Sequence, residues 1–137
     1  MTTSPPTGYL ADTHILIWAL NDPDRLSPAV AAILADESAA VFFSPVNLWE
    51  IAVKHGLGKL DLAGHTPEDV LTALVESSFV ERPLTAATAA SSHRLPRHHK
   101  DPFDRLLIWD AIQGGVTLLS ADAAVDAYID SGLRVVH

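Results

Sequence analysis

Four acidic residues of the chain stand where their carboxylates could act together. Asp12 follows the apolar stretch GYLA and Asp122 lies two residues beyond VTLLS, and both stretches are typical of short buried strands. Asp104 lies near the start of an apolar helical pattern, and Glu50 lies within another. Ligands of an open parallel sheet bind beyond the carboxyl ends of its strands, so we expect these four side chains to converge there.

Converging carboxylates need a source of positive charge, because several like charges within a few ångströms cannot all stay ionised unaided. Either some of them take up protons, or a divalent cation neutralises them. Carboxylate oxygens suit Mg²⁺ or Mn²⁺, and the 137 residues include no cysteine that could favour zinc. An ion of this kind activates water for attack on a phosphodiester, so we predict a hydrolytic metal centre.

Each of these acids also has a purely structural explanation. Asp12 and Asp122 could cap the helices that follow them, since an N-cap aspartate accepts hydrogen bonds from free backbone N–H groups. Asp101 is placed as the N-cap of the apolar helix PFDRLLIWDA, whose first position holds a proline. Glu50 could form a solvated ion pair with Lys54 one turn later.

The elements that must position these acids alternate along the chain. Short apolar runs predict strands at residues 8–11, 39–44, 79–83, 116–120 and 134–137. Apolar residues at helical spacing predict helices at residues 13–21, 28–37, 45–58, 67–77, 85–95, 102–114 and 122–129, with Asp110 and Asp126 on exposed helix surfaces. This alternation predicts an α/β fold, a three-layer sandwich whose central, mostly parallel sheet of about four to five strands is flanked by helices.

Composition fits one globular domain, with 48% hydrophobic and 19% charged residues. The net charge of −8 argues against a protein that coats nucleic acid by charge alone, although HRLPRHHK places basic residues directly before Asp101. No apolar run approaches the roughly 20 residues of a membrane span. The N-terminal residues have neither basic charge nor a signal-like apolar segment, so we expect a cytoplasmic protein without membrane contact.

Four blocks of the sequence resemble, in order and spacing, the PIN-domain toxins of VapC type: YLADTH, SPVNLWEIAVKHGLGKL, HHKDPFDRLLIWDA and LLSAD. The likeness runs from Tyr9 to His137, nearly the whole chain, and the DPFDRLLI and WEIAVKHGLGKL stretches are quite specific to one branch of that family. It implies a single PIN-like domain over residues 1–137, with residues 1–7 as a flexible N-terminal extension.

The resemblance implies a metal-dependent endoribonuclease, the toxin of a type II toxin–antitoxin system, which hydrolyses RNA through a metal-activated water. The family's acids match Asp12, Glu50, Asp104 and Asp122, which we predict to be catalytic and to bind Mg²⁺ or Mn²⁺. Accessory roles are assigned to Asp101, Thr13 and Ser120. Residues expected to draw the RNA backbone toward the acids are Arg94, Arg97, His98, His99, Lys100 and Arg105. The implied protein partners are a cognate antitoxin and a second copy of the chain, as a homodimer.

Two other functions fit some of the same residues. A phosphatase could use Asp12 as its nucleophile, although such enzymes usually need a second aspartate two residues later, where this chain has His14. A non-catalytic binding module stabilised by metal would bind a divalent ion and a partner without cutting any nucleic acid.

Overall fold

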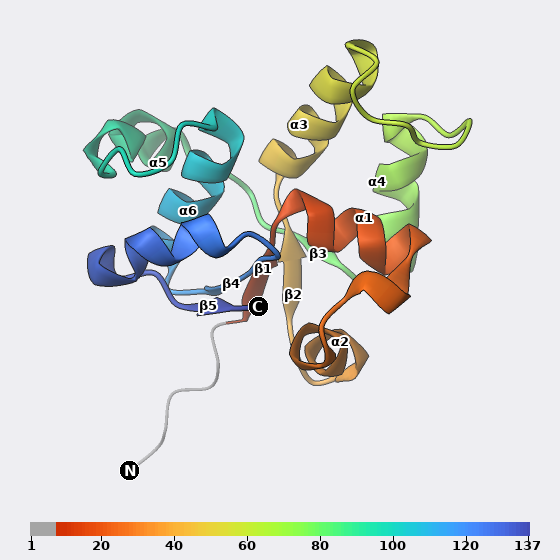
Figure 1. Ribbon diagram of the computed structural model, residues 1–137, viewed down its shortest axis with the longest axis horizontal. Helices are drawn as coiled ribbons and strands as arrows, with labels where there is room; N and C mark the ends of the chain where they lie inside the picture. Colours follow the sequence, from red (N-terminus) through yellow and green to blue (C-terminus); the bar gives the residue numbers. More distant parts are fainter. Residues whose placement is uncertain (1–7) are drawn as a thin grey trace.

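The computed structural model describes residues 8–137 (Figure 1), so the extension predicted at residues 1–7 lies outside the described residues. Within residues 8–137, one sheet has five strands: β1 (Tyr9–Ala11), β2 (Val41–Phe43), β3 (Val80–Glu81), β4 (Thr117–Leu119) and β5 (Val135–Val136). All neighbouring strands are parallel, in the order β3-β2-β1-β4-β5. Tyr9 pairs with Val41 on one side and with Thr117 on the other. The prediction of a mostly parallel sheet is confirmed.

Helices connect the strands, and their N-terminal caps agree with the sequence pattern. They are α1 (Thr13–Asn21), η1 (Pro23–Arg25), α2 (Pro28–Ala35), α3 (Pro45–Gly56), α4 (Pro67–Glu76), α5 (Ala86–Ser91), η2 (Ser92–Arg94), α6 (Pro102–Gly114) and η3 (Ala123–Ser131). Asp12, Ser27, Ser44 and Asp101 each accept a hydrogen bond from a backbone N–H of the first turn that follows. Gly115 forms the C-terminal cap of α6, and its φ of 66° suits glycine best.

Two predicted helices differ from the structure. The helix expected at residues 85–95 divides into α5 and the 3-10 helix η2, where the hydroxyl of Ser92 donates to the carbonyl oxygen of Ala89 and competes with regular helical bonding. The helix expected at residues 122–129 is the 3-10 helix η3. The first change lies away from the predicted acids, whereas Asp122 is the N-cap of η3.

Alternate residues of each central strand pack on opposite faces of the sheet, which gives two cores. Leu10 and Leu118 belong to a core that also contains Leu107 and Ile108 of α6 and Tyr128 of η3. The following residues on the strands, Ala11 and Leu119, belong to the second core, with side chains of α1, α2 and α4. The sheet is therefore the middle layer of a sandwich, as expected.

The carboxyl ends of the strands define the edge at which the acids lie. Helix α1 begins directly after β1 and α3 directly after β2, so both N-termini lie beyond the same edge of the sheet (Figure 1). The α/β order of the chain thus places the residues after β1, β2 and β4 close together in space. Across residues 8–137, no helix is long and apolar enough to cross a membrane.

Candidate metal centre

Asp12 is fixed at the end of β1 by backbone hydrogen bonds to both carboxylate oxygens. Its Oδ1 accepts from the amide of Ile15 at 3.0 Å, and its Oδ2 accepts from the amide of Ala121 at 3.3 Å. The side chain is only 8% exposed, and this burial raises the pKa of Asp12 above its ordinary value. The residue therefore caps α1 and faces the site at the same time, so the structural and functional interpretations are compatible.

Glu50 lies on α3 with its carboxylate turned toward the end of β1. The hydroxyl of Thr13 donates to Oε1 of Glu50 at 2.5 Å, and the ammonium of Lys54 forms an ion pair with Oε2. The amide of Asn47 donates to the hydroxyl of Thr13 and to the carbonyl oxygen of Ala11. The ion pair with Lys54 exists, but Glu50 is 2% exposed, so this is not the solvated pair of the purely structural explanation.

Asp104 is the residue around which the acids gather. Ligand atoms of Glu50, Asp101 and Asp104 all lie within 4.8 Å of one another. Burial, together with the charges of Asp101 and Glu50, raises the pKa of Asp104 to about 7. Asp101 also accepts hydrogen bonds from the amides of Phe103 and Asp104, at 2.8 and 3.2 Å, which confirms it as the cap of α6.

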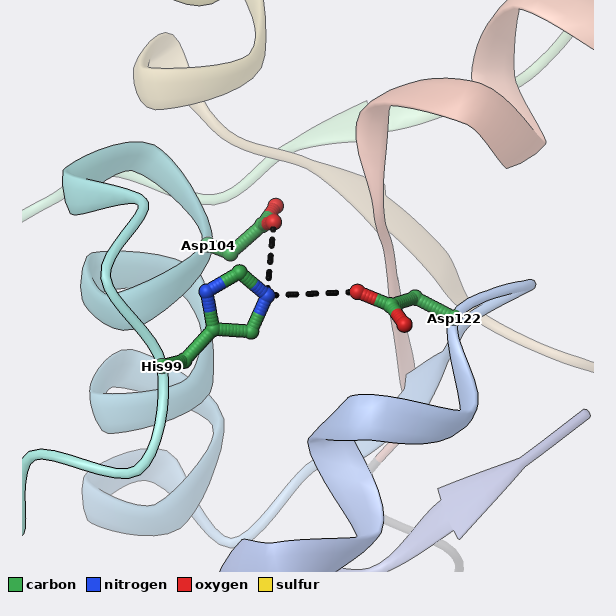
Figure 2. Close-up of side chains that lie close together, drawn as sticks. All are labelled: His99, Asp104 and Asp122. Carbon is green, nitrogen blue, oxygen red and sulfur yellow. Dashed lines mark hydrogen bonds and ion pairs between the residues drawn. The ribbon is translucent and has the colours of Figure 1, made fainter.

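Asp122 lies close to Asp104, and the ring of His99 contacts both of their carboxylates. Figure 2 shows Nε2 of His99 facing both carboxylates, 3.3 Å from Oδ2 of Asp104 and 3.2 Å from Oδ2 of Asp122. Asp122 caps η3 through the amide of Ala124, and this hydrogen bond lowers the pKa of Asp122. The hydroxyl of Ser120 accepts from the amide of Asp122 at 3.0 Å, so this accessory residue orients the turn.

The predicted acids are thus brought together through Asp104. It shares one set of close ligand atoms with Glu50 and another with His99 and Asp122. Asp12 belongs to neither set among residues 8–137, but its charge contributes to the raised pKa of Asp104, after burial and closer charges. Asp12 therefore lies at the border of the cluster.

The donor chemistry of this cluster fits Mg²⁺ or Mn²⁺. Its oxygen donors are carboxylates, which hard divalent cations prefer, and they come from separate elements that the sheet holds in place. Burial, and after it the charges of Asp101 and Glu50, raise the pKa of Asp104, so a cation held beside it would favour its ionised form. Lys54 and His99 supply the cationic or proton-donating contacts that the chain itself provides.

The predicted basic residues divide into two sets. Four of them, Arg94, Arg97, His98 and Lys100, are exposed on η2 and the loop that leads to α6. The guanidinium of Arg105, in contrast, donates to the carbonyl oxygens of Pro96 and Leu95, at 2.9 and 3.0 Å. His99 faces the acids, as described above. Arg105 and His99 thus have structural partners in addition to any role with RNA.

A partly buried ion pair between α6 and the segment after β3 was not predicted from the sequence. Asp110 is 2% exposed and accepts hydrogen bonds from Nε and Nη2 of Arg82, at 3.0 and 3.2 Å. The prediction that Asp110 lies on a helix surface was therefore wrong, because α6 packs against the segment that follows β3. Asp126 is exposed as predicted, and its carboxylate contacts His137. Nothing in the helical spacing of the two acids distinguishes them.

A comparison with protein families assigns the chain to a known family. The family model described as PIN domain matches residues 9–129, which is far more than half of the chain. The chain belongs to the PIN domain family. PIN domains are generally nucleases, so membership supports a hydrolase that cuts nucleic acid. A comparison with curated proteins gives no match.

The fold is also similar to that of chains in several solved structures. DNA-bound VapBC from Salmonella typhimurium aligns with a TM-score of 0.67 at 16% identity, over 94% of this chain and 96% of that chain. VapBC2 from Rickettsia felis, bound to a promoter DNA fragment, aligns with a TM-score of 0.64 at 17% identity, over 93% of this chain and 96% of that chain. FitAcB from Neisseria gonorrhoeae aligns with a TM-score of 0.58 at 20% identity, over 94% of this chain and 96% of that chain. At such identities the likeness shows the fold alone.

Proposed function

We propose that this PIN domain protein is an endoribonuclease that depends on Mg²⁺ or Mn²⁺ and acts as the toxin of a type II toxin–antitoxin system. The observation that carries the proposal is the position of Asp104, which shares one group of close ligand atoms with Glu50 and Asp101 and another with His99 and Asp122. The resemblance of four sequence blocks to VapC-type toxins supports the choice of RNA as substrate. The fold shared with VapBC complexes supports the toxin assignment.

Asp104, Glu50 and Asp122 would hold the ion, and Asp12 would complete the set from the end of β1. When bound, such an ion supplies Lewis-acid chemistry, polarising the phosphodiester and making water a better nucleophile. The chain itself holds the carboxylates in position: Thr13 fixes Glu50, and the amides of Ile15 and Ala121 fix Asp12. This preorganisation lets the carboxylates accept an ion without first reorienting.

The exposed residues Arg94, Arg97, His98 and Lys100 would bind the RNA backbone beside the acids. They lie within ten residues of Asp104 in the sequence, on the segment that leads into α6, so contacts to phosphates there would bring the strand to the metal centre. The protein has a net charge of −8, and this local set would provide attraction that the whole surface does not.

A cognate antitoxin would bind the toxin in the cytoplasm and block its activity. Formation of a homodimer is part of the same proposal. Of the apolar residues available for such contacts, Leu71 is 39% exposed on α4, whereas Leu74 is fully buried in the core. Light scattering of the purified toxin, alone and with its antitoxin, measures both associations.

The geometry does not favour the two other functions considered. Asp12 is only 8% exposed and both of its carboxylate oxygens accept backbone hydrogen bonds, which is a poor setting for a nucleophile that must reach a phosphomonoester. A binding module without catalysis would hold its ion with the same carboxylates, so the geometry gives it no preference over the nuclease, and cleavage of nucleic acid separates the two.

The direct test is cleavage of total cellular RNA by the wild-type protein in Mg²⁺, in Mn²⁺ and in a chelator. We expect cleavage with either ion and none in the chelator. Asp104→Asn should abolish it while the circular dichroism spectrum stays that of the wild type. Asp130→Asn, which changes an exposed acid of η3, is the matched control and should cut normally. Full activity of Asp104→Asn, or cleavage in the chelator, would show that RNA cleavage does not depend on the metal centre.

A further inference from the structure

The ring of His99 has a hydrogen-bond partner on each nitrogen. Nδ1 accepts a hydrogen bond from the backbone amide of Asp101 at 3.1 Å. Nε2 lies 3.3 Å from Asp104 and 3.2 Å from Asp122, on the opposite edge of the ring (Figure 2). An amide N–H can only donate, so Nδ1 carries no proton in this arrangement. The proton of the neutral ring is therefore on Nε2, between the two carboxylates.

This tautomer decides what His99 can do at the metal centre. Its Nε2 has no free lone pair, so the ring cannot bind an ion through the nitrogen that faces the acids. A ring turned to bind metal through Nε2 would need a proton on Nδ1, which would then meet the N–H of Asp101. Although His99, Asp104 and Asp122 have the spacing of a metal triad, the backbone of Asp101 makes His99 a donor instead.

The loop that carries His99 is itself fixed by buried groups. The hydroxyl of Tyr128 accepts from the amides of His98 and His99, at 3.0 and 2.8 Å, and donates to the carbonyl oxygen of Pro96 at 2.8 Å. Tyr128 is fully buried on η3, and Arg105 on α6 donates to the same carbonyl. The ring thus takes its position from the backbone of residues 96–99.

We infer that His99 is a positioning residue that holds Asp104 and Asp122 together through its Nε2–H. The inference rests on the proposed function and extends it, because it assigns His99 to the acids rather than to RNA. Residues that hydrogen-bond metal-ligating carboxylates typically change ion affinity roughly 10- to 100-fold when removed. His99 would act on the ion only through the two aspartates.

Two substitutions distinguish the contacts of Nε2 from the contact of Nδ1. In His99→Gln the side-chain amide can reach the position of Nε2 and donate to the aspartates. In His99→Asn the shorter side chain can still accept from the amide of Asp101 but cannot reach Asp104 or Asp122. His93→Asn, the same change at an exposed histidine of η2, is the matched control. Thermal unfolding of each variant shows whether the fold is kept.

The experiment measures Mn²⁺ affinity by calorimetry for the four proteins, and the ¹⁵N spectrum of histidine side chains in the metal-free wild type. We expect His99→Asn to lose roughly 10- to 100-fold in affinity, His99→Gln to stay closer to the wild type, and His93→Asn to match it. We also expect the His99 signal to show a proton on Nε2 alone. The ¹⁵N measurement needs no variant and so does not depend on any variant folding.

A proton on Nδ1, or equal affinities of the Gln and Asn variants, would overturn the assignment of His99 while leaving the nuclease proposal intact. Failure of the wild-type protein to bind any divalent ion would overturn both. The two failures are therefore distinguishable in one set of titrations.

Discussion

The hydroxyl of Thr13, the first residue of α1, donates a 2.5 Å hydrogen bond to Oε1 of Glu50 on α3. This contact joins α1 and α3, the helices that follow the neighbouring strands β1 and β2, beside the candidate metal centre. Thr13 receives a hydrogen bond from Asn47 in turn, so the buried carboxylate belongs to a small network in which each polar group has a partner.

Thr13→Val tests this network. The change keeps the shape of the side chain but leaves Oε1 of the buried Glu50 without its donor and takes from Asn47 one of its two acceptors, the other being the carbonyl oxygen of Ala11. We expect the free energy of unfolding in urea to fall by about 1–3 kcal/mol, with weaker Mg²⁺ binding. Thr13→Ser keeps the hydroxyl and should retain most of the stability and most of the Mg²⁺ affinity. Equal stability of the Val and wild-type proteins would show that the network is dispensable.

Asp104→Asn should stabilise the protein when no metal is present. The pKa of Asp104 is raised from 3.8 to about 7 in the folded state, first by burial and then by the charges of Asp101 and Glu50. A carboxyl with a raised folded-state pKa stabilises the fold below its unfolded pKa, and this contribution is lost as the pH rises through about 7. At about pH 8 in a chelator, we expect the Asn variant to be more stable by about 1–3 kcal/mol.

The same measurement at low pH supplies the control for that prediction. Near pH 5, Asp104 of the metal-free wild type is protonated and resembles asparagine, so the difference between the two proteins should shrink. Thermal unfolding in a chelator at both pH values measures it. A difference of the same size at both pH values would assign the effect to packing rather than to charge.

Lys54→Met should destabilise the metal-free protein more than the metal-loaded one. The ammonium of Lys54 is the cation paired with the buried Glu50, and an ion bound at Asp104 would supply positive charge to the same carboxylate. We expect a loss of about 1–3 kcal/mol in a chelator, and a smaller loss in saturating Mg²⁺. Lys59→Met, at an exposed position, is the control. Equal losses of stability with and without Mg²⁺ would show that Lys54 and the ion do not compensate the same carboxylate.

Asp110→Ala should be among the most damaging changes outside the metal centre. It leaves the guanidinium of Arg82 half-buried without its carboxylate, and breaking a buried pair costs about 3–5 kcal/mol. The double variant Arg82→Met/Asp110→Leu removes both charges and should recover much of that loss. Urea unfolding of both variants and of the exposed control Asp126→Asn measures the effect. A loss for Asp110→Ala no larger than that of the control would refute the structural role.

The parallel sheet and the helix caps could be predicted from sequence because both depend on local patterns. Asp12 and Asp101 follow the rules for N-caps, and α1 begins and ends where its apolar pattern does. Long-range partners were not predictable in this way. Asp110 and Asp126 look alike in the sequence, yet only Asp110 meets a cation from a segment 28 residues away and becomes buried.

The role of His99 shows the same limit within the site. Its position five residues before Asp104 places it in the basic stretch, and spacing alone assigns it to the RNA backbone. Its actual partners include Asp122, which is 23 residues distant, and the loop geometry that decides its tautomer depends on the buried hydroxyl of Tyr128. Such contacts arise only when η3 and α6 pack together.

The central claim, that the carboxylates gathered at Asp104 bind one or more divalent ions jointly, is tested most directly by titrating metal-free protein with Mn²⁺ in a calorimeter. We predict saturable binding by the wild type and by Asp130→Asn, and a loss of that binding in Asp104→Asn. Binding of equal affinity in all three proteins, or no saturable binding by the wild type, would contradict the claim.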